Sequence, residues 1–185
     1  RDVEKYLAQD DRLMLVLGAC EQHAYLSLLT DIKIPLALAD SASTRTGVLV
    51  APPLNFGFSH YFLDYPGTLS LRVPTLIAAV EDLVRSAYHS GFRRLLILNG
   101  HGGNTPVNDH LNDVINELPG AQIGWYQWWD SHSVEAIAIK HNLKPAHANW
   151  LEAFPFTIVG ELPEGEKIPP SVPSSIMDAA AARRV

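Results

Sequence analysis

Short apolar runs alternate with longer stretches of helical character along this chain. Four runs have the length and composition of buried strands, at Leu13–Gly18, Gly47–Ala51, Arg94–Leu98 and Gln122–Gln127. Strands that alternate with helices favour a parallel sheet, because parallel neighbours need long crossover connections. The pattern predicts an α/β fold, a three-layer α/β/α sandwich with a mainly parallel central sheet and helices on both faces.

Two helices are well marked in the middle of the chain. Val73–Ser90 has apolar residues at helical spacing and is followed by Gly91, a common C-terminal signal. Thr105–Leu118 places its apolar residues on one stripe, with Asn104 as the predicted N-cap and Pro106 in the first turn. A capped helix start would direct free amide hydrogens into the loop that precedes it.

The length and composition predict one compact domain over residues 1–185. The 185 residues are 47% hydrophobic, which is enough for a substantial core. The proline-rich segment Glu161–Pro173 predicts a surface loop, and Ser174–Arg184 predicts a helix. Because the chain begins at Arg1 rather than Met and stops close to that helix, both ends are expected to be trimmed.

The charge distribution argues against nucleic-acid and membrane partners. The net charge is −6, and acids and bases are interspersed without a basic stripe. The apolar run Leu13–Leu17 is too short to span a bilayer and follows two aspartates rather than a basic segment. The single cysteine, Cys20, cannot form an internal disulfide, so a reducing cytoplasm is the expected location.

A glycine-rich loop directly follows the predicted strand Arg94–Leu98. It reads Asn99-Gly100-His101-Gly102-Gly103-Asn104, so the backbone is open on both sides of one imidazole. We expect Gly102, Gly103 and Asn104 to contact a substrate, with amide hydrogens of the following helix holding a carbonyl or carboxylate group.

A second group of polar residues follows the predicted strand Leu13–Gly18. It contains Glu21 and His23, with Asp31 after a short interval. Carboxylate oxygens and imidazole nitrogens are ligands that zinc, manganese and iron(II) accept. Two strand ends therefore carry metal-ligating residue types.

These motifs resemble the creatininase family of metal-dependent amidohydrolases. The resemblance covers most of the chain, and its blocks occur in the family's order. They are Glu21-Gln22-His23 with Thr30-Asp31, then Tyr65-Pro66-Gly67-Thr68-Leu69-Ser70-Leu71, then Gly91 to Arg94 leading into Asn99 to Asn104, and a weaker block of His147-Ala148 with Glu152.

The resemblance implies a pair of divalent ions, zinc, manganese or iron. The family's ligand positions correspond here to Glu21, His23, Asp31 and His101. Two ions bridged by Asp31 would activate a water for attack on an amide carbon.

Two residues of the weaker block complete the implied site. A glutamate that creatininase itself uses as a ligand is replaced by Gly103, so we assign the missing carboxylate to Glu152, as a metal ligand and catalytic residue. His147 corresponds to the family's proton donor. Positions five apart on a regular helix do not share a face, so His147 and Glu152 can converge only if His147 precedes the helix.

Other departures from the family pattern affect the substrate more than the metals. The first block is one residue short and lacks a second histidine, with Ala24 to Ser27 in its place. Phe62 stands where the family often has a histidine, and His60 lies two residues earlier. Trp128 and Trp129 are expected to be part core and part pocket wall, with Trp128 a candidate substrate contact.

The predicted function is hydrolysis of the C–N bond of a non-peptide amide in a small molecule. A cyclic amide is the expected substrate. The resemblance also implies a homo-oligomer, a hexamer in the family, and Phe154-Pro155-Phe156 is a candidate contact segment. The alternative is a catalytically silent relative that binds metal or a small molecule. A phosphate-binding module is disfavoured, because the glycine loop lacks a Gly-Lys-Ser/Thr ending.

Overall fold

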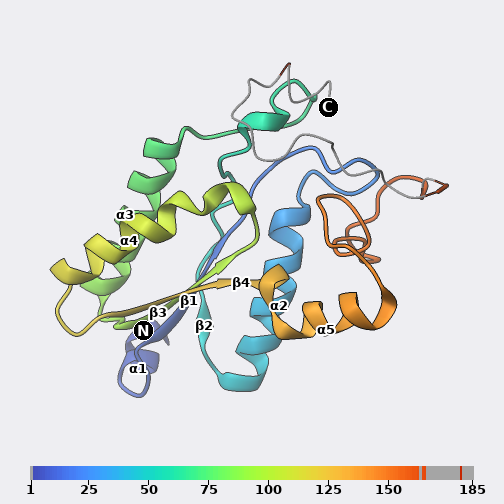
Figure 1. Cartoon of the computed structure of the whole chain (residues 1–185). Coiled ribbons are helices and arrows are strands. Elements are labelled where there is room, and N and C mark those ends of the chain that lie inside the picture. Colours follow the sequence, from blue (N-terminus) through green and yellow to red (C-terminus); the bar gives the residue numbers. More distant parts are fainter. Residues whose placement is uncertain (1, 163, 166–179, 181–185) are drawn as a thin grey trace.

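The computed structural model describes residues 2–162, 164–165 and 180 of the chain (Figure 1). Within them it has one four-stranded sheet in the order β2-β1-β3-β4, and every neighbouring pair is parallel. The strands are β1 (Arg12–Leu17), β2 (Leu49–Val50), β3 (Arg94–Asn99) and β4 (Gln122–Gln127). The predicted α/β class and parallel sheet are confirmed, although β2 is shorter than the predicted strand at Gly47–Ala51.

Helices cover both faces of this sheet. They are α1 (Asp2–Leu7), α2 (Thr30–Thr46), α3 (Val73–Ser90), α4 (Pro106–Val114) and α5 (His132–His141), and none of those described is long and apolar enough to cross a membrane. In Figure 1, α3 and α4 lie on one side of the strands, and α2 and α5 lie on the other. The predicted helix at Ser174–Arg184 falls almost wholly outside the described residues.

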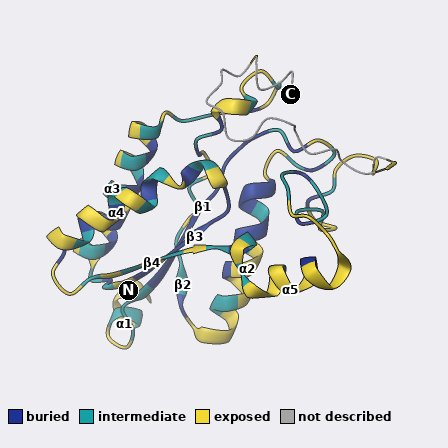
Figure 2. Ribbon diagram, viewed as in Figure 1, coloured by how far each residue is buried: buried dark blue, intermediate teal, exposed yellow. Residues whose placement is uncertain are grey.

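The larger core lies between the sheet and the pair α3 and α4. Alternate strand residues such as Leu15 and Ile97 point to this face, since side chains alternate across a strand. They pack against a helical stripe that includes Val80, Val84 and Val107, which are fully buried. Figure 2 shows the buried strand β1 between helices whose outer faces are exposed.

A smaller core on the opposite face joins the sheet to α2. Val16 and Leu98 point to this side and contact Ala39 of α2. Both faces of β1 and of the second half of β3 are thus covered, which explains why these segments are continuous apolar runs rather than alternating ones.

The strand order creates a natural site between β1 and β3. From β1 the chain passes to β2 on one side, whereas β3 lies on the other side, so the loops that leave β1 and β3 diverge. A crevice at such a switch point, at the carboxyl ends of the strands, is where open α/β sheets bind ligands. Both of the polar motifs identified in the sequence begin at these two strand ends.

Candidate metal centre

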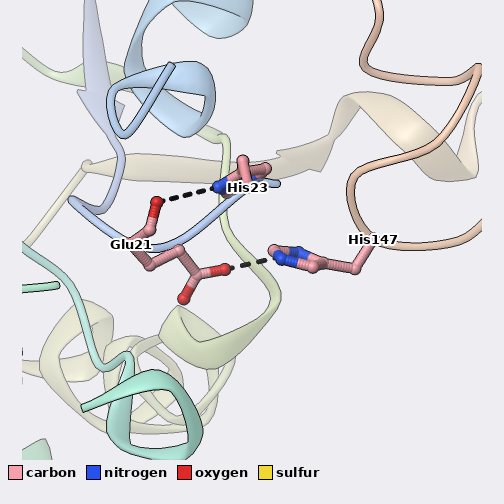
Figure 3. Close-up of side chains that lie close together, drawn as sticks. All are labelled: Glu21, His23 and His147. Atoms are coloured by element: carbon pink, nitrogen blue, oxygen red, sulfur yellow. Dashed lines mark hydrogen bonds and ion pairs between the residues drawn. The ribbon is translucent and has the colours of Figure 1, made fainter. Parts of the chain in front are cut away.

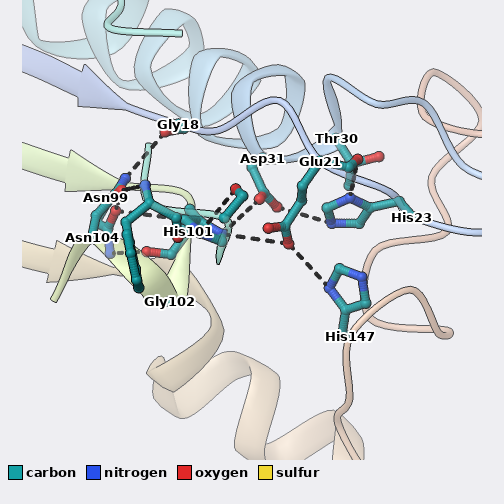
Figure 4. A network of polar contacts seen from close by, with 12 residues as sticks. Gly18, Glu21, His23, Thr30, Asp31, Asn99, His101, Gly102, Asn104 and His147 are labelled. Atoms are coloured by element: carbon teal, nitrogen blue, oxygen red, sulfur yellow. Dashed lines mark hydrogen bonds and ion pairs between the residues drawn. The ribbon is translucent and has the colours of Figure 1, made fainter. Parts of the chain in front are cut away.

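Four buried polar side chains meet at the carboxyl ends of β1 and β3. Glu21 and His23 come from the loop after β1, Asp31 from the first turn of α2, and His101 from the loop after β3 (Figure 4). Their exposed fractions are only 2%, 1%, 3% and 8%. Gly18 permits this convergence, because a Cβ there would lie 2.8 Å from the Asp31 carbonyl oxygen.

Asp31 lies between the two imidazoles. Its Oδ1 is 3.1 Å from Nε2 of His23, and its Oδ2 is 2.9 Å from Nδ1 of His101. Glu21 Oε1 lies 3.6 Å from the same His101 nitrogen. Because Nδ1 of His23 donates to the backbone carbonyl of Glu21 at 3.1 Å, the Nε2 atom of His23 is directed at the carboxylates.

The segment 145–152 brings two further side chains to this group. Glu152 Oε1 lies 3.7 Å from Nε2 of His23, and its Oε2 accepts the Ala148 N–H at 2.5 Å. Residues 147–152 form turns rather than a helix, and Ala148 has φ of 53°. This irregular backbone allows His147 and Glu152 to point the same way, without the helix at Glu152 that the sequence had suggested.

His147 faces the centre from the more open side. Its Nδ1 lies 3.5 Å from Glu21 Oε1 (Figure 3). Its Nε2 donates to the Gln22 carbonyl at 2.8 Å. Its ring lies 4.2 Å from that of His23 and stacks on Phe62, with centroids 4.6 Å apart. The side chain keeps 30% of its surface exposed, compared with 0% for His23.

Three overlapping groups of side chains have the spacing of a metal site within the described residues. In each group the donor atoms lie within 4.8 Å of one another. Asp31 belongs to two of the groups, which supply different remaining donors. The groups are Glu21, Asp31 and His101; His23, Asp31 and Glu152; and Glu21, His23 and His147.

The donor atoms themselves fit cations better than they fit one another. Glu21 Oε2 is buried without a hydrogen-bond partner among the residues described, and the buried His23 Nε2 and Asp31 Oδ2 face an Asp31 oxygen and a His101 nitrogen of the same centre. Leaving buried polar atoms unpaired is costly, and divalent cations accept this mixture of carboxylate and imidazole donors. The residues present therefore fit divalent metal binding.

The pKa values reflect three carboxylates crowded around buried imidazoles. Burial lowers the pKa of His23, but Asp31 and Glu152 raise it to about 11. Burial likewise opposes the charge on His101, and Asp31 and Glu21 raise its pKa to about 9. Without a cation, the two imidazoles carry the compensating positive charge, so metal binding must release protons.

The remaining groups shift in directions set by burial and by these histidines. Burial, reinforced by Asp31, raises the pKa of Glu21 to about 7. Burial also raises the pKa of Asp31, but its contacts with His101 and His23 hold it well below its usual range. Burial and the nearby charge of His23 lower the pKa of His147 to about 4, so its imidazole is neutral at pH 7.

A cavity of about 490 Å³ opens onto these side chains. Its walls are largely aromatic and apolar, and Gly102 and Gly103 of the glycine loop form part of its lining. The wall residues include Phe58, Tyr61, Phe62, Trp129 and Leu151.

Two predicted substrate contacts need correction. Trp128 does not line the cavity; it is 6% exposed and packs with Ile34 and Leu151, while its neighbour Trp129 forms the wall. Asn104 is also absent from the lining and does not cap α4, whose N-cap is Thr105. Its side chain turns inward and bonds to Gly18, Phe58 and Asn99.

One site segment was not found from the sequence. Phe58 and Ser59, between β2 and α3, reach the centre, where Nε2 of His101 donates to the Phe58 carbonyl at 2.7 Å. The available signal was Gly57, where a Cβ would lie 2.4 Å from Asn104 Oδ1. His60, which the sequence left open, lies outside the cavity lining and stacks on Phe58.

Comparison with known proteins gives a consistent set of relatives. The model of the creatininase family, described as creatinine amidohydrolase, matches residues 1–180. A creatinine amidohydrolase from Pseudomonas putida is 36% identical over 135 residues, which are 66% of this chain and 52% of that protein. A mycofactocin precursor peptide peptidase from Mycobacterium ulcerans is 32% identical over 61% of this chain and 48% of its own length. This chain thus spans about half the length of these curated relatives.

Solved structures agree with the sequence matches. A manganese form of creatininase aligns with a TM-score of 0.67 at 29% identity, over 80% of this chain and 64% of that one. A mutant creatininase of Zn–Zn type aligns with a TM-score of 0.65 at 27% identity, over 75% and 61% of the two chains.

Proposed function

This chain belongs to the creatininase family, and we propose that it is a metal-dependent amidohydrolase that cleaves a non-peptide amide bond in a small molecule. The observation that carries the proposal is the position of Asp31, whose two oxygens face two separate donor sets. An aspartate with two oxygens can bridge a pair of ions, and two-metal sites are typical of hydrolases that use activated water.

The two ions are assigned to the two groups that share Asp31. Glu21 and His101 would hold one ion with Asp31, and His23 and Glu152 would hold the other. Manganese and zinc are the preferred candidates, because the chain aligns with creatininases of manganese and zinc type. Bound ions of this kind lower the pKa of a water toward neutrality and polarise a substrate carbonyl. Glu152 thereby takes the place of the carboxylate missing at Gly103.

His147 is assigned to proton transfer. Its Nε2 donates to the Gln22 carbonyl, which leaves Nδ1 facing Glu21 and the centre. A neutral imidazole in this position can take a proton at Nδ1 and give it to the departing nitrogen. The stacked ring of Phe62 holds the imidazole in this orientation. Gly102 and Gly103 leave the cavity wall open for contact with the substrate carbonyl.

The cavity favours a planar substrate. Its aromatic walls offer ring faces at Tyr61, Phe62 and Trp129, and flat molecules stack on such surfaces. One relative is named for creatinine and another for a peptide. We propose a cyclic amide, since its ring fills a cavity of about 490 Å³ better than an extended chain does.

Assembly is proposed from an exposed aromatic pair. Phe154 and Phe156 stack on each other with 37% and 46% of their surfaces exposed, which suits a contact with another copy of the chain. We propose a cytoplasmic homo-oligomer, a hexamer by analogy with the family. Light scattering at micromolar concentration tests this, and a monomeric mass would contradict it.

A metal-supplemented substrate screen tests the proposed activity. Protein purified without chelator is loaded with Mn²⁺ or Zn²⁺, and cyclic amides, formamides and short peptides are offered separately. We expect two bound ions per chain and turnover of a cyclic amide. Two bound ions without turnover of any of these compounds would favour the catalytically silent alternative, and no bound ion would refute the metal assignment.

A further inference from the structure

The shortest contact at Nε2 of His101 is a backbone carbonyl, with the Ser59 hydroxyl farther away at 3.5 Å. Its Nε2 donates to the Phe58 carbonyl oxygen at 2.7 Å, so its proton lies on Nε2. The other nitrogen, Nδ1, is then directed at Asp31 Oδ2, 2.9 Å away. A metal-ligating histidine needs this arrangement, because the hydrogen bond at one nitrogen fixes the tautomer and aims the other nitrogen at the ion.

The Phe58 carbonyl can approach His101 only because residue 103 is glycine. A Cβ at Gly103 would lie 2.0 Å from the Phe58 oxygen and 2.5 Å from Nε2 of His101. Carbon and oxygen atoms that are not bonded to each other do not approach so closely, so any side chain here would displace the carbonyl. In contrast, a Cβ at the neighbouring Gly102 would meet nothing within 4 Å.

The Phe58 backbone is in turn held by Asn104. The side-chain oxygen of Asn104 accepts the Phe58 N–H at 3.3 Å. Its Nδ2 donates to the Gly18 carbonyl at 3.1 Å and to Asn99 Oδ1 at 3.2 Å. Asn104 is fully buried, so these bonds form away from water, where losing a partner is costly.

This one side chain therefore ties together three segments around the centre. Gly18 ends the run of β1, Asn99 ends β3, and Phe58 lies in the loop between β2 and α3. Figure 4 shows Asn104 with Gly18 and Asn99 on the side of His101 away from His23. Asn104 does not touch the cavity, so its contribution has to pass through the residues it holds.

We propose that Asn104, the Phe58 carbonyl and His101 form a positioning relay, in which each group holds the next. This relay sets the affinity of the Glu21, Asp31 and His101 group for its metal ion. Because Gly103 has no side chain, the Phe58 carbonyl has room to contact His101. The proposal rests on the metal centre of the proposed function. It also explains the departure from creatininase at position 103, because a carboxylate side chain and the relay carbonyl exclude each other there. Asn104 and Gly103 are positioning residues, since neither supplies a donor atom to the centre.

The decisive comparison is between Gly103→Ala and Gly102→Ala. Each adds one methyl group to the glycine loop, but only the first displaces the Phe58 carbonyl. Competition with a chromophoric chelator measures the two Zn²⁺ dissociation constants of each variant. Glu152→Gln shows which of the two constants belongs to the ion assigned to His23, Asp31 and Glu152. We expect Gly103→Ala to lower the affinity for the ion assigned to Glu21, Asp31 and His101 by about 10- to 100-fold. This is the usual effect of losing the hydrogen-bond partner of a ligating histidine. The other ion should stay within about threefold of the wild type, and Gly102→Ala should change neither.

Asn104→Ala tests the far end of the relay, and the same one-ion loss is expected. Equal affinities in Gly103→Ala and Gly102→Ala would overturn the relay. Parallel loss of both ions with a lowered melting temperature would also overturn it, because that pattern reports general damage. Wild-type protein that binds no Zn²⁺ would instead refute the metal centre itself.

A measurement on the wild-type protein keeps the test independent of variant folding. In the zinc-loaded protein, ¹⁵N spectra of labelled histidine should show His101 as a neutral ring protonated at Nε2. A ring protonated at Nδ1 would overturn the proposal, because the Phe58 carbonyl would then have no donor to accept.

Discussion

Replacing His147 with alanine should separate chemistry from metal binding. The His147 pKa of about 4 leaves roughly 0.1% of the imidazole protonated at pH 7, so it must gain a proton before it can donate one. A positioned acid or base of this kind contributes about 10²- to 10⁴-fold to rate. We therefore expect kcat to fall by about 10²- to 10⁴-fold. At about 1.36 kcal/mol per tenfold, this raises the activation free energy by about 2.7–5.4 kcal/mol.

Metal content should remain nearly unchanged in His147→Ala, since its Nε2 is engaged with Gln22 and the two assigned groups do not include it. The assay measures kcat on the best substrate of the screen, with zinc or manganese quantified on the same samples. His101→Ala is the reference, because it removes a donor and should lose an ion and activity together. His147 also belongs to a third possible metal group. Loss of an ion in His147→Ala would show that it is a ligand, and unchanged kcat would remove it from the mechanism.

Three further predictions concern the centre and its support. Because the pKa values of His101 and His23 are raised in the fold, their protonated imidazoles stabilise the metal-free protein. This stabilisation is complete below pH 6.5, the pKa of an ordinary histidine, and it is lost as the pH rises through about 9 and beyond. Thermal melts of chelator-treated protein should therefore show falling stability from pH 7 to 9.5, and melts of metal-loaded protein should not. Asp31→Asn should reduce the metal content from two ions to none by elemental analysis. Gly18→Ala should cost about 1–3 kcal/mol in urea unfolding, because its Cβ would lie 2.5 Å from a side-chain carbon of α2, whereas Gly124→Ala meets only an ordinary contact.

The sequence predicted the sheet well because its signals are local. β1, β3 and β4 are six-residue strands within apolar runs, and α3 has both its stripe and its terminal glycine. The helix α2 gave no comparable signal, since its apolar residues do not form one clear stripe and Pro35 lies inside it. Asp31 was found through its residue type and motif, but its place in the first turn of α2 came only from the structure.

Both corrected contacts reflect choices that a single sequence does not determine. Trp128 and Trp129 are adjacent aromatic residues after β4, and the turn Trp128–Asp130 decides which one faces the core and which one the cavity. Asn104 has the residue type of an N-cap, but its side chain bonds to Gly18 after β1, to Phe58 and to Asn99 at the end of β3. Gly18 and Phe58 are 86 and 46 residues away in the chain, so local rules could not reveal these bonds.

Position 103 is a glutamate in creatininase and a glycine in this chain, and the two residues would support the metal centre in different ways. A carboxylate there would add a negative donor to a centre that already contains Glu21, Asp31 and Glu152. Gly103 instead admits a neutral carbonyl that acts on His101 from behind, and the third carboxylate arrives from segment 145–152 at the other side of the centre. Because Glu152 lies on an irregular segment that also carries His147, one backbone arrangement positions both the proposed ion ligand and the proposed proton-transfer group. Disturbing that segment should therefore affect metal binding and catalysis together, whereas a side chain at Gly103 should affect metal binding through His101.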